Sequence, residues 1–144
     1  RMNTVNWTYN KKDYLENHDD ELYGFVYCVY FEDGKGDIYK YYGKKKWFSE
    51  RKKHFGKKRL AEVTDKRLKT YEIVKSDNDW ITYTGSCKDT KDYIPIHKEI
   101  ICFARSQREL TYLEAKVMFQ RGAIEDDECL NGNLLGKFYR NNLV

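Results

Sequence analysis

A single carboxylate lies on the apolar face of the most clearly helical segment. Ser106, with Glu109 three residues later, has the signature of a capping box, and Gly122 marks the end of the helix. The apolar arc of this helix is formed by Leu110, Leu113, Val117 and Met118. Glu114 falls within that arc at about 100° per residue, where an unpaired carboxylate costs on the order of several kcal/mol. It is therefore either a structural glutamate, paired with a base or at the edge of the core, or a group held for a divalent cation or for acid–base chemistry.

The positive charge of the chain is concentrated between Lys40 and Lys69. This window holds thirteen basic and three acidic residues, a net charge of +10, whereas the whole chain carries +4. Such asymmetry indicates a polyanionic partner, with nucleic acid as the first choice, or else a solvated surface. Aromatic residues are interleaved with the charges, which favours nucleic acid. The residues expected to bind DNA are Lys44, Lys45, Lys46, Lys52, Lys53, Lys57, Lys58 and Arg59.

Two strands, a later strand and the helix must position these groups. Residues 25–31 form an aromatic and β-branched run, Asp33-Gly34-Lys35-Gly36 is a turn signal, and residues 38–42 resume strand composition, which predicts an antiparallel hairpin. Residues 97–104 predict a buried strand and residues 80–84 a short extended segment. We therefore expect an α/β fold of the α+β type, a small three-stranded antiparallel sheet flanked by helices in a single domain.

The remaining segments are less patterned. We expect an N-terminal arm over residues 2–22, with a marginal helix around residues 12–17, and a domain over residues 23–144. Within that domain we expect a short helix over residues 47–55 and a basic insertion at about 56–79. No apolar run is long enough to cross a membrane, and no signal segment is visible, so we expect a cytoplasmic protein that does not act on membranes. The cysteines lack zinc spacing and are expected as free thiols: Cys28, Cys87, Cys102 and Cys129.

The hairpin carries two short sequence motifs, one on each strand. Phe25-Val26-Tyr27, preceded by Gly24, lies on the first strand, and Tyr41-Tyr42-Gly43 lies on the second. An arginine, a histidine, a helix-borne glutamate and a late asparagine follow. This order resembles the GIY-YIG nuclease family, and most closely its small phage-borne homing endonucleases. The first motif departs from the family in having Phe25 where the family has glycine.

The resemblance implies site residues one by one. The catalytic set would be Tyr27, Tyr41, Arg51, His54, Glu114 and Asn131. Arg59 and Arg67 compete with Arg51 for the role of the family's arginine, and Asn133 competes with Asn131.

The resemblance also implies how these residues would act. Glu114 would hold one divalent ion, Mg²⁺ or Mn²⁺, with water and phosphate oxygens completing its shell. Tyr27 would deprotonate or orient the attacking water, and neighbouring lysines could lower its pKa from the ordinary value of about 10. Tyr41 would hydrogen-bond the phosphate or the water, and Arg51 would clamp the scissile phosphate. His54 would contact phosphate or shuttle a proton, and Asn131 would orient another site group.

The leading hypothesis is a metal-dependent DNA endonuclease of the phage GIY-YIG type, with a homing or nicking role, acting in the host cytoplasm if the chain is phage-encoded. The alternative is a non-catalytic nucleic-acid-binding module that uses the basic window at residues 40–69, with Glu114 structural. A third class is a small phage protein that binds a host protein. One site cuts one strand at a time, so a double-strand break would need a homodimer or two successive events.

Overall fold

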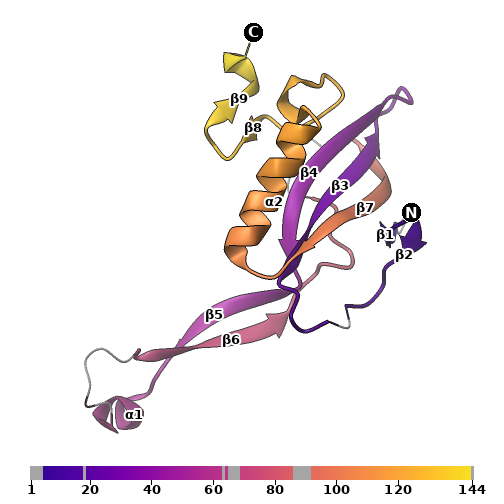
Figure 1. The fold of residues 1–144 in the computed structure, drawn as a ribbon. Helices are drawn as coiled ribbons and strands as arrows, with labels where there is room; N and C mark the ends of the chain where they lie inside the picture. The colour runs from indigo at the N-terminus through magenta and orange to yellow at the C-terminus, as the bar shows by residue number, and fades with distance from the viewer. Residues whose placement is uncertain (1–4, 18, 63, 65–68, 86–91, 144) are drawn as a thin grey trace. The chain divides into compact units, whose positions relative to one another are not determined.

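The computed structural model describes residues 5–17, 19–62, 64, 69–85 and 92–143. These fall into two compact units, the first formed by the chain up to Trp47 together with the chain from Asp79 onward, and the second by Phe48–Asn78. In the first unit, a five-stranded sheet has the order β2-β1-β7-β3-β4 (Figure 1). Its strands are β1 (Trp7–Tyr9), β2 (Lys12–Asp13), β3 (Gly24–Glu32), β4 (Ile38–Lys46) and β7 (Ile94–Ala104).

The predicted hairpin and late strand form the centre of this sheet. β3 pairs antiparallel with β4 and with β7, so the three predicted strands are present and antiparallel. The expectation of a three-stranded sheet was nevertheless wrong, because β1 joins the edge of β7 in parallel and β2 folds back on β1. The sheet is therefore five-stranded and mixed.

The N-terminal residues join the sheet because they carry an aromatic anchor. Trp7 is 1% exposed, its ring packs 5.0 Å from that of Phe25, and its Nε1 donates to the carbonyl of Trp80 at 2.6 Å. The turn between β1 and β2 places Asn10 and Lys11 at positive φ, as a tight hairpin turn requires. Residues 12–17 consequently do not form the predicted helix.

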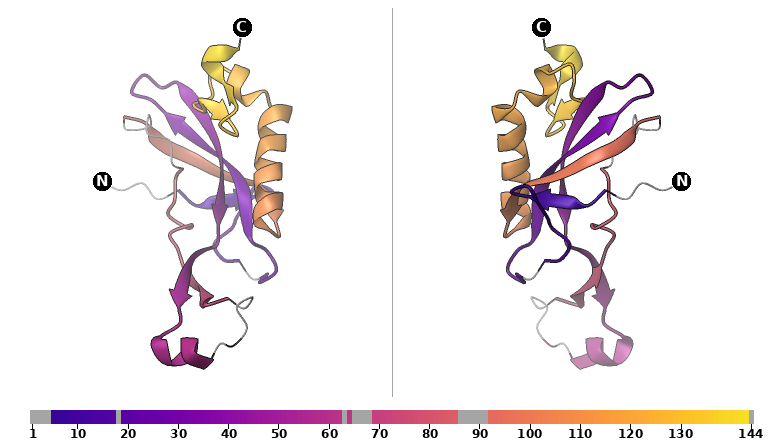
Figure 2. Two further views of the ribbon diagram at one scale, coloured as in Figure 1. Left: turned by 90° about the vertical axis from the view of Figure 1, so that its left-hand side faces the viewer. Right: turned by 90° about the vertical axis from the view of Figure 1, so that its right-hand side faces the viewer.

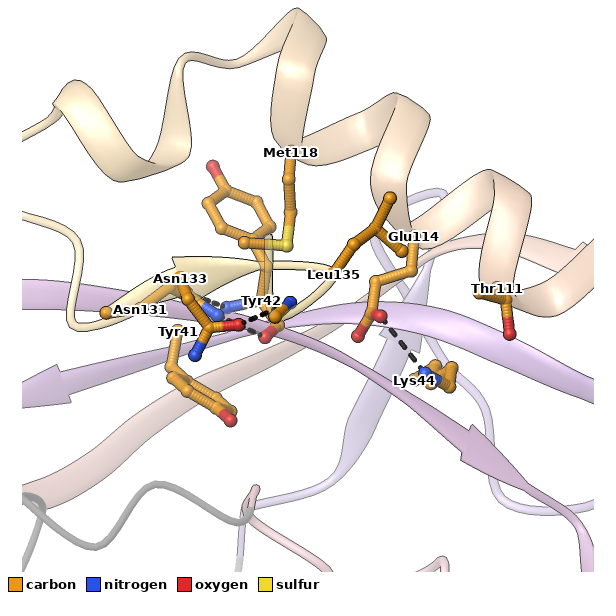
Figure 3. A pocket seen from close by; sticks show the side chains of 11 residues that line it. Tyr41, Tyr42, Lys44, Thr111, Glu114, Met118, Asn131, Asn133 and Leu135 are labelled. Atoms are coloured by element: carbon orange, nitrogen blue, oxygen red, sulfur yellow. Dashed lines mark hydrogen bonds and ion pairs between the residues drawn. The ribbon is translucent and has the colours of Figure 1, made fainter. Parts of the chain in front are cut away.

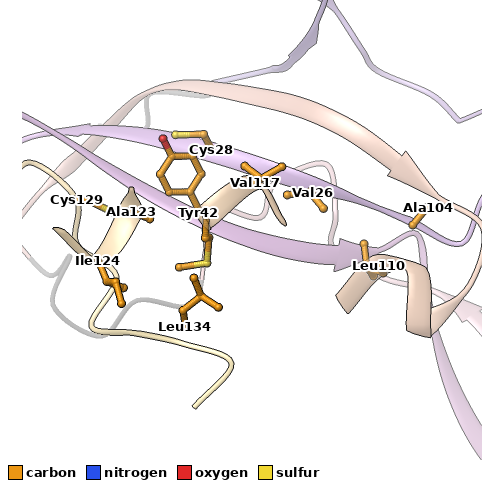
Figure 4. Packing of buried hydrophobic residues seen from close by; sticks show 11 residues of the cluster. Val26, Cys28, Tyr42, Ala104, Leu110, Val117, Ala123, Ile124, Cys129 and Leu134 are labelled. Carbon is orange, nitrogen blue, oxygen red and sulfur yellow. The ribbon is translucent and has the colours of Figure 1, made fainter. Parts of the chain in front are cut away.

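The predicted helix is confirmed as α2 (Gln107–Gln120). Ser106 Oγ accepts from the backbone N–H of Glu109 at 3.1 Å, and the Glu109 carboxylate accepts from the N–H of Arg105 at 2.7 Å. The helix covers one face of the sheet (Figure 2) and buries Leu110, Val117 and Met118 against it. Figure 4 shows the resulting core, which includes Val26, Cys28, Tyr42, Ala104, Ala123, Ile124, Cys129 and Leu134.

After α2 the chain continues into short elements that reach the outer edge of β4. They are η2 (Ala123–Glu125), β8 (Asn133–Leu134), β9 (Phe138–Tyr139) and η3 (Arg140–Asn142). The N–H of Lys40 donates to the carbonyl of Glu128, and the N–H of Leu130 donates to the carbonyl of Lys40, each at 2.8 Å. These bonds cover part of an edge strand that would otherwise expose its backbone groups.

The second unit is a two-stranded ribbon with a short helix. It contains β5 (Phe48–His54), α1 (Lys57–Glu62) and β6 (Tyr71–Asp77). The helix predicted over residues 47–55 was wrong, because β5 pairs along its whole length with β6 and pairing overrides the local preference. The segment after it, residues 80–84, forms turns and not the predicted extended segment: the N–H groups of Thr82 and Tyr83 both donate to the carbonyl of Asp79.

The described helices include none that is long and apolar enough to cross a membrane. Cys28, Cys102 and Cys129 are free thiols, as expected, whereas Cys87 lies outside the described residues.

Candidate active site

Tyr27 and Gly43, the last residues of the two sequence motifs, lie directly opposite each other on β3 and β4. The Tyr27 ring passes over Gly43, so that a Cβ at position 43 would lie 2.5 Å from Cζ of Tyr27 and closer still to its hydroxyl oxygen. Tyr27 is only 1% exposed. Glycine at position 43 is therefore a steric requirement for the position of the Tyr27 hydroxyl.

The segment that follows the second unit covers the Tyr27 hydroxyl. Tyr83 hydrogen-bonds the Tyr27 side chain, and their ring centroids lie 6.0 Å apart. Gly85 has a φ of +103°, and a Cβ there would lie 3.2 Å from the Tyr41 ring and 3.6 Å from the Tyr27 hydroxyl. Tyr27, Tyr41, Tyr83 and Gly85 thus form one cluster. Tyr83 and Gly85 were not among the predicted site residues, because nothing in their sequence shows that they reach the Tyr27 hydroxyl.

The environment of Tyr27 keeps its hydroxyl protonated. Burial, above all, raises the pKa of Tyr27 well above its ordinary value, and Tyr83, Tyr41 and the charge of Glu114 raise it further. The expectation that neighbouring lysines lower this pKa was wrong. Lys44 points to the opposite face of the sheet, and Lys45 lies with its Nζ 4.0 Å from the centre of the Tyr83 ring and 2.9 Å from Asp79 Oδ1.

A buried lysine anchors the segment that carries Tyr83. The Nζ of Lys98, a fully buried residue on β7, donates to the carbonyls of Ile81 at 2.9 Å and Tyr83 at 2.8 Å. The same atom lies 4.3 Å from the centre of the Trp7 ring, at cation–π distance. Burial lowers the pKa of Lys98 to about 8. Lys98 fixes the chain at the position from which Tyr83 reaches Tyr27.

Glu114 lies in a pocket between α2 and β4. Its carboxylate points from α2 toward β4, where Oε1 lies 3.2 Å from Lys44 Nζ (Figure 3). The pocket has a volume of about 410 Å³, and Tyr41 lines it from the β4 side. The Glu114 side chain is 19% exposed, so it is paired yet accessible from the pocket. The helical arc that pointed to a partly buried carboxylate was therefore right.

Asn131 takes the place of a neighbouring strand at the edge of β4. Its side-chain Oδ1 accepts from the N–H of Tyr42 at 2.8 Å, and its Nδ2 donates to the carbonyl of Tyr42 at 2.9 Å. Asn131 is 7% exposed, whereas its competitor Asn133 is exposed and accepts from the N–H of Gly136 within a turn. Asn131 thus fixes the backbone between Tyr41 and Gly43, and both asparagines line the pocket.

Arg140 holds the chain that carries Asn131. Its guanidinium donates to four carbonyls, at 3.0 Å for Asp126, 3.2 Å for Ala123, 2.9 Å for Cys129 and 2.7 Å for Asn131. A guanidinium with five donors is suited to such a cluster of acceptors. Arg140 was not among the predicted site residues, because its role depends on a loop that closes around its guanidinium.

Comparison with known proteins identifies the family. The family model described as "Putative endonuclease segE, GIY-YIG domain" matches residues 7–143. The chain belongs to this GIY-YIG endonuclease family. Comparisons with curated proteins and with solved structures gave no match. The GIY-YIG resemblance read from the two hairpin motifs is confirmed.

The remaining predicted residues of the GIY-YIG set lie in the second unit. Arg51 and His54 are exposed residues of β5, and neither lies on a helix, although the helix expected over residues 47–55 would have carried both. Arg59 lies on α1 with its guanidinium 4.0 Å from the centre of the Phe55 ring, and Arg67 lies outside the described residues. Within the first unit, Tyr41, Glu114 and Asn131 line one pocket. Tyr27 belongs to the neighbouring cluster with Tyr41, on the face of the sheet opposite Lys44, while Arg51 and His54 remain predictions.

The donor set for a metal ion is a single carboxylate. Among the described residues, no group of three or more His, Cys, Asp and Glu side chains could hold an ion. Glu114 opens into a roomy pocket with polar walls, and Mg²⁺ commonly binds through one or two carboxylates, keeping several waters and taking substrate oxygens as further ligands. The residues present fit an ion held in that manner and do not fit a closed protein cage.

Proposed function

We propose that this chain is a DNA endonuclease that hydrolyses phosphodiester bonds with the help of a divalent cation. One observation carries the proposal: Glu114, Lys44, Tyr41 and the Asn131-anchored backbone of β4 meet around a single pocket in a GIY-YIG chain. Tyr27 lies beside that pocket, linked to it through Tyr41 and near enough to Glu114 for the carboxylate to raise its pKa.

Each pocket residue has a task in this proposal. Glu114 would hold Mg²⁺ or Mn²⁺, which supplies charge against the phosphate and lowers the pKa of a bound water. Lys44 forms an ion pair with the Glu114 carboxylate, so its ammonium lies at the pocket wall, where it can neutralise phosphate charge. Tyr41 hydrogen-bonds the phosphate or the attacking water from the other wall.

Tyr27 acts in this proposal as a neutral phenol. Because its pKa is raised by burial, its hydroxyl keeps its proton at neutral pH and donates a hydrogen bond. It positions Tyr41 within their shared cluster, and it does not remove a proton as a free phenolate. Asn131 positions Tyr41 and Gly43 by holding the Tyr42 peptide between them.

Conversion of supercoiled plasmid tests the proposal. Purified protein with Mg²⁺ is expected to give nicked circles first, since one pocket cuts one strand, and EDTA should abolish the product. Glu114→Gln should abolish it as well, whereas Glu125→Gln, an exposed carboxylate outside this pocket, should leave it unchanged. Cleavage that persists in EDTA or in Glu114→Gln would contradict the proposal. A homing role would further require cuts at one defined sequence.

The second candidate is a binding module without catalysis. The Lys44–Glu114 ion pair favours it, because a paired glutamate at the edge of a core also has a purely structural explanation. The same plasmid experiment separates the two candidates. A plasmid that is retarded on a low-salt gel yet stays supercoiled with Mg²⁺ would support the binding module.

A further inference from the structure

The second unit, Phe48–Asn78, has no apolar core of its own. None of its described residues is buried, and Ile73 and Leu60 are 47% and 40% exposed. A lone two-stranded ribbon is at best marginally stable in water. A bound partner would add stability to such a ribbon, and the chemistry of its side chains indicates which partner.

Cations take the place of apolar neighbours around its aromatic rings. Lys52 Nζ lies 4.6 Å and Lys69 Nζ 5.8 Å from the centre of the Tyr71 ring. Lys75 Nζ lies 4.4 Å from the Phe48 ring. These contacts order Lys52 and Lys75 on the ribbon face opposite Arg51 and Lys53, so these two ammonium groups are available to backbone phosphates and not to the bases.

The charge of this unit is greatest in the part of the sequence between its two strands. The sequence between Phe55 and Thr70 has six basic and two acidic residues, whereas β5 and β6 together have four basic and three acidic ones. Opposite residues in the ribbon share a face. One face carries Glu50 and Asp77 beside its lysines, and the other carries Ser49, Arg51, Lys53 and Ser76 with the single acid Glu72.

We propose that the second unit is a DNA-binding arm: the cations of α1, Lys57, Lys58 and Arg59, bind backbone phosphates, and the ribbon enters the major groove with the face of Arg51 and Lys53 toward the bases. The major groove of B-DNA is wide enough for a two-stranded ribbon. Serine, arginine and lysine are hydrogen-bonding types suited to base edges. This inference rests on the proposed function only in taking DNA as the substrate.

The chain leaves and re-enters the first unit at adjacent points. Lys45 pairs with Asp79 at 2.9 Å, and the rings of Trp47 and Trp80 lie 4.7 Å apart. These contacts hold the two ends of the first unit's chain, at Trp47 and Asp79, close together. Variants within the arm are therefore expected to change DNA binding while leaving the fold of the first unit unchanged.

The test measures binding to a duplex oligonucleotide with EDTA present, so that cleavage plays no part. The variant is Lys57→Gln, Lys58→Gln and Arg59→Gln together. The matched control is Lys12→Gln, Lys35→Gln and Lys137→Gln, three exposed lysines of the first unit. If the three arm cations each contact a phosphate, the slope of log K against log salt falls by about 2.7, at about 0.9 per contact, and the control slope stays unchanged.

Amide hydrogen exchange on the wild-type chain adds a measurement that does not depend on any variant. Amides of β5 and β6 should exchange quickly in the free protein and become protected when duplex DNA is added. Equal slopes for the two triple variants, or no protection in β5 and β6, would overturn the arm. Equal competition by duplex RNA would overturn the groove placement, since the major groove of A-form RNA is too narrow for side chains to read.

These outcomes are separable from those of the nuclease proposal. An arm that binds DNA in a chain that never cuts plasmid would leave this inference in place and refute the endonuclease. Mg²⁺-dependent cutting by a chain whose β5 and β6 amides are not protected by DNA would support the endonuclease and refute the arm.

Discussion

Replacing Gly43 by alanine adds one methyl group at the most crowded point of the site. The new Cβ would lie 2.5 Å from Cζ of Tyr27 and 3.1 Å from Cε1. Real Cβ atoms do not approach ring carbons this closely, so the Tyr27 ring or the β3–β4 pairing must shift. The ring is 1% exposed and packs against Trp7 at 5.3 Å, so it has little room to move.

The expected cost follows from that crowding. Overpacking of a closed site costs about 1–3 kcal/mol, and we expect the free energy of unfolding in urea to fall by about 2 kcal/mol. Plasmid nicking should fall by at least about tenfold, since a displacement of about 1 Å at a reacting group can cost about 100-fold. Gly132→Ala is the matched control, because a Cβ at that pocket-lining glycine would meet no atom within 4 Å.

A double-mutant cycle assigns the effect to Tyr27. In a Tyr27→Phe background the closest clash, with the hydroxyl oxygen, is gone, so Gly43→Ala should cost less stability there than in the wild type. A loss of stability below about 0.5 kcal/mol for Gly43→Ala, or the same loss in both backgrounds, would refute the steric account of the motif glycine.

Three further measurements test the supports of the site. Arg140→Met removes four carbonyl contacts and should cost about 2–4 kcal/mol in urea unfolding, whereas the exposed Arg105→Met should cost under about 0.5 kcal/mol. Asn131→Ala should destabilise the chain by about 2 kcal/mol and reduce nicking, while Asn133→Ala should leave stability unchanged. The lowered pKa of Lys98 means that the folded state binds fewer protons than the unfolded state between about pH 8 and 10.5. The free energy of unfolding should therefore rise with pH across that window and fall as the pH drops toward 8. If plots of this free energy against pH have the same slope for the wild type and Lys98→Met, the prediction is contradicted.

The sequence predicts those parts of the fold that depend on local signals. The turn at Asp33–Gly36 and the capping residues Ser106 and Glu109 identify the hairpin and α2, because turns and caps are specified by neighbouring residues. β1 and β5 were missed for the opposite reason. Trp7 becomes part of a strand by packing against Phe25, and β5 by pairing with β6, contacts that no local pattern contains.

The residues of the candidate site likewise fall into those that the sequence identifies and those that it does not. The sequence identified four of the site residues through the family resemblance, because residue type and order carry it: Tyr27, Tyr41, Glu114 and Asn131. The position of Glu114 on the apolar arc of the helix pointed to it independently. The sequence could not identify Tyr83, Lys98 and Arg140. Each acts through a hydrogen bond to a backbone carbonyl or a hydroxyl far away in the sequence, which it reaches only after folding. Lys44 does not lower the pKa of Tyr27 because alternate residues of β4 face opposite sides of the sheet. Lys45 lies on the same side as Tyr27, but it pairs with Asp79 and lies over the Tyr83 ring.

Asn131 is followed by Gly132, the dipeptide in which an asparagine most readily loses ammonia through a cyclic imide. That ring closes when the backbone nitrogen of Gly132 attacks the side-chain carbonyl of Asn131, which requires the side chain to turn away from β4. Both of its hydrogen bonds to Tyr42 oppose this rotation. The rate of deamidation at Asn131 therefore reports how often the edge of β4 opens. An aspartate formed there would set a negative charge against the Tyr42 carbonyl, so ageing of the protein would loosen the pocket wall at this point first.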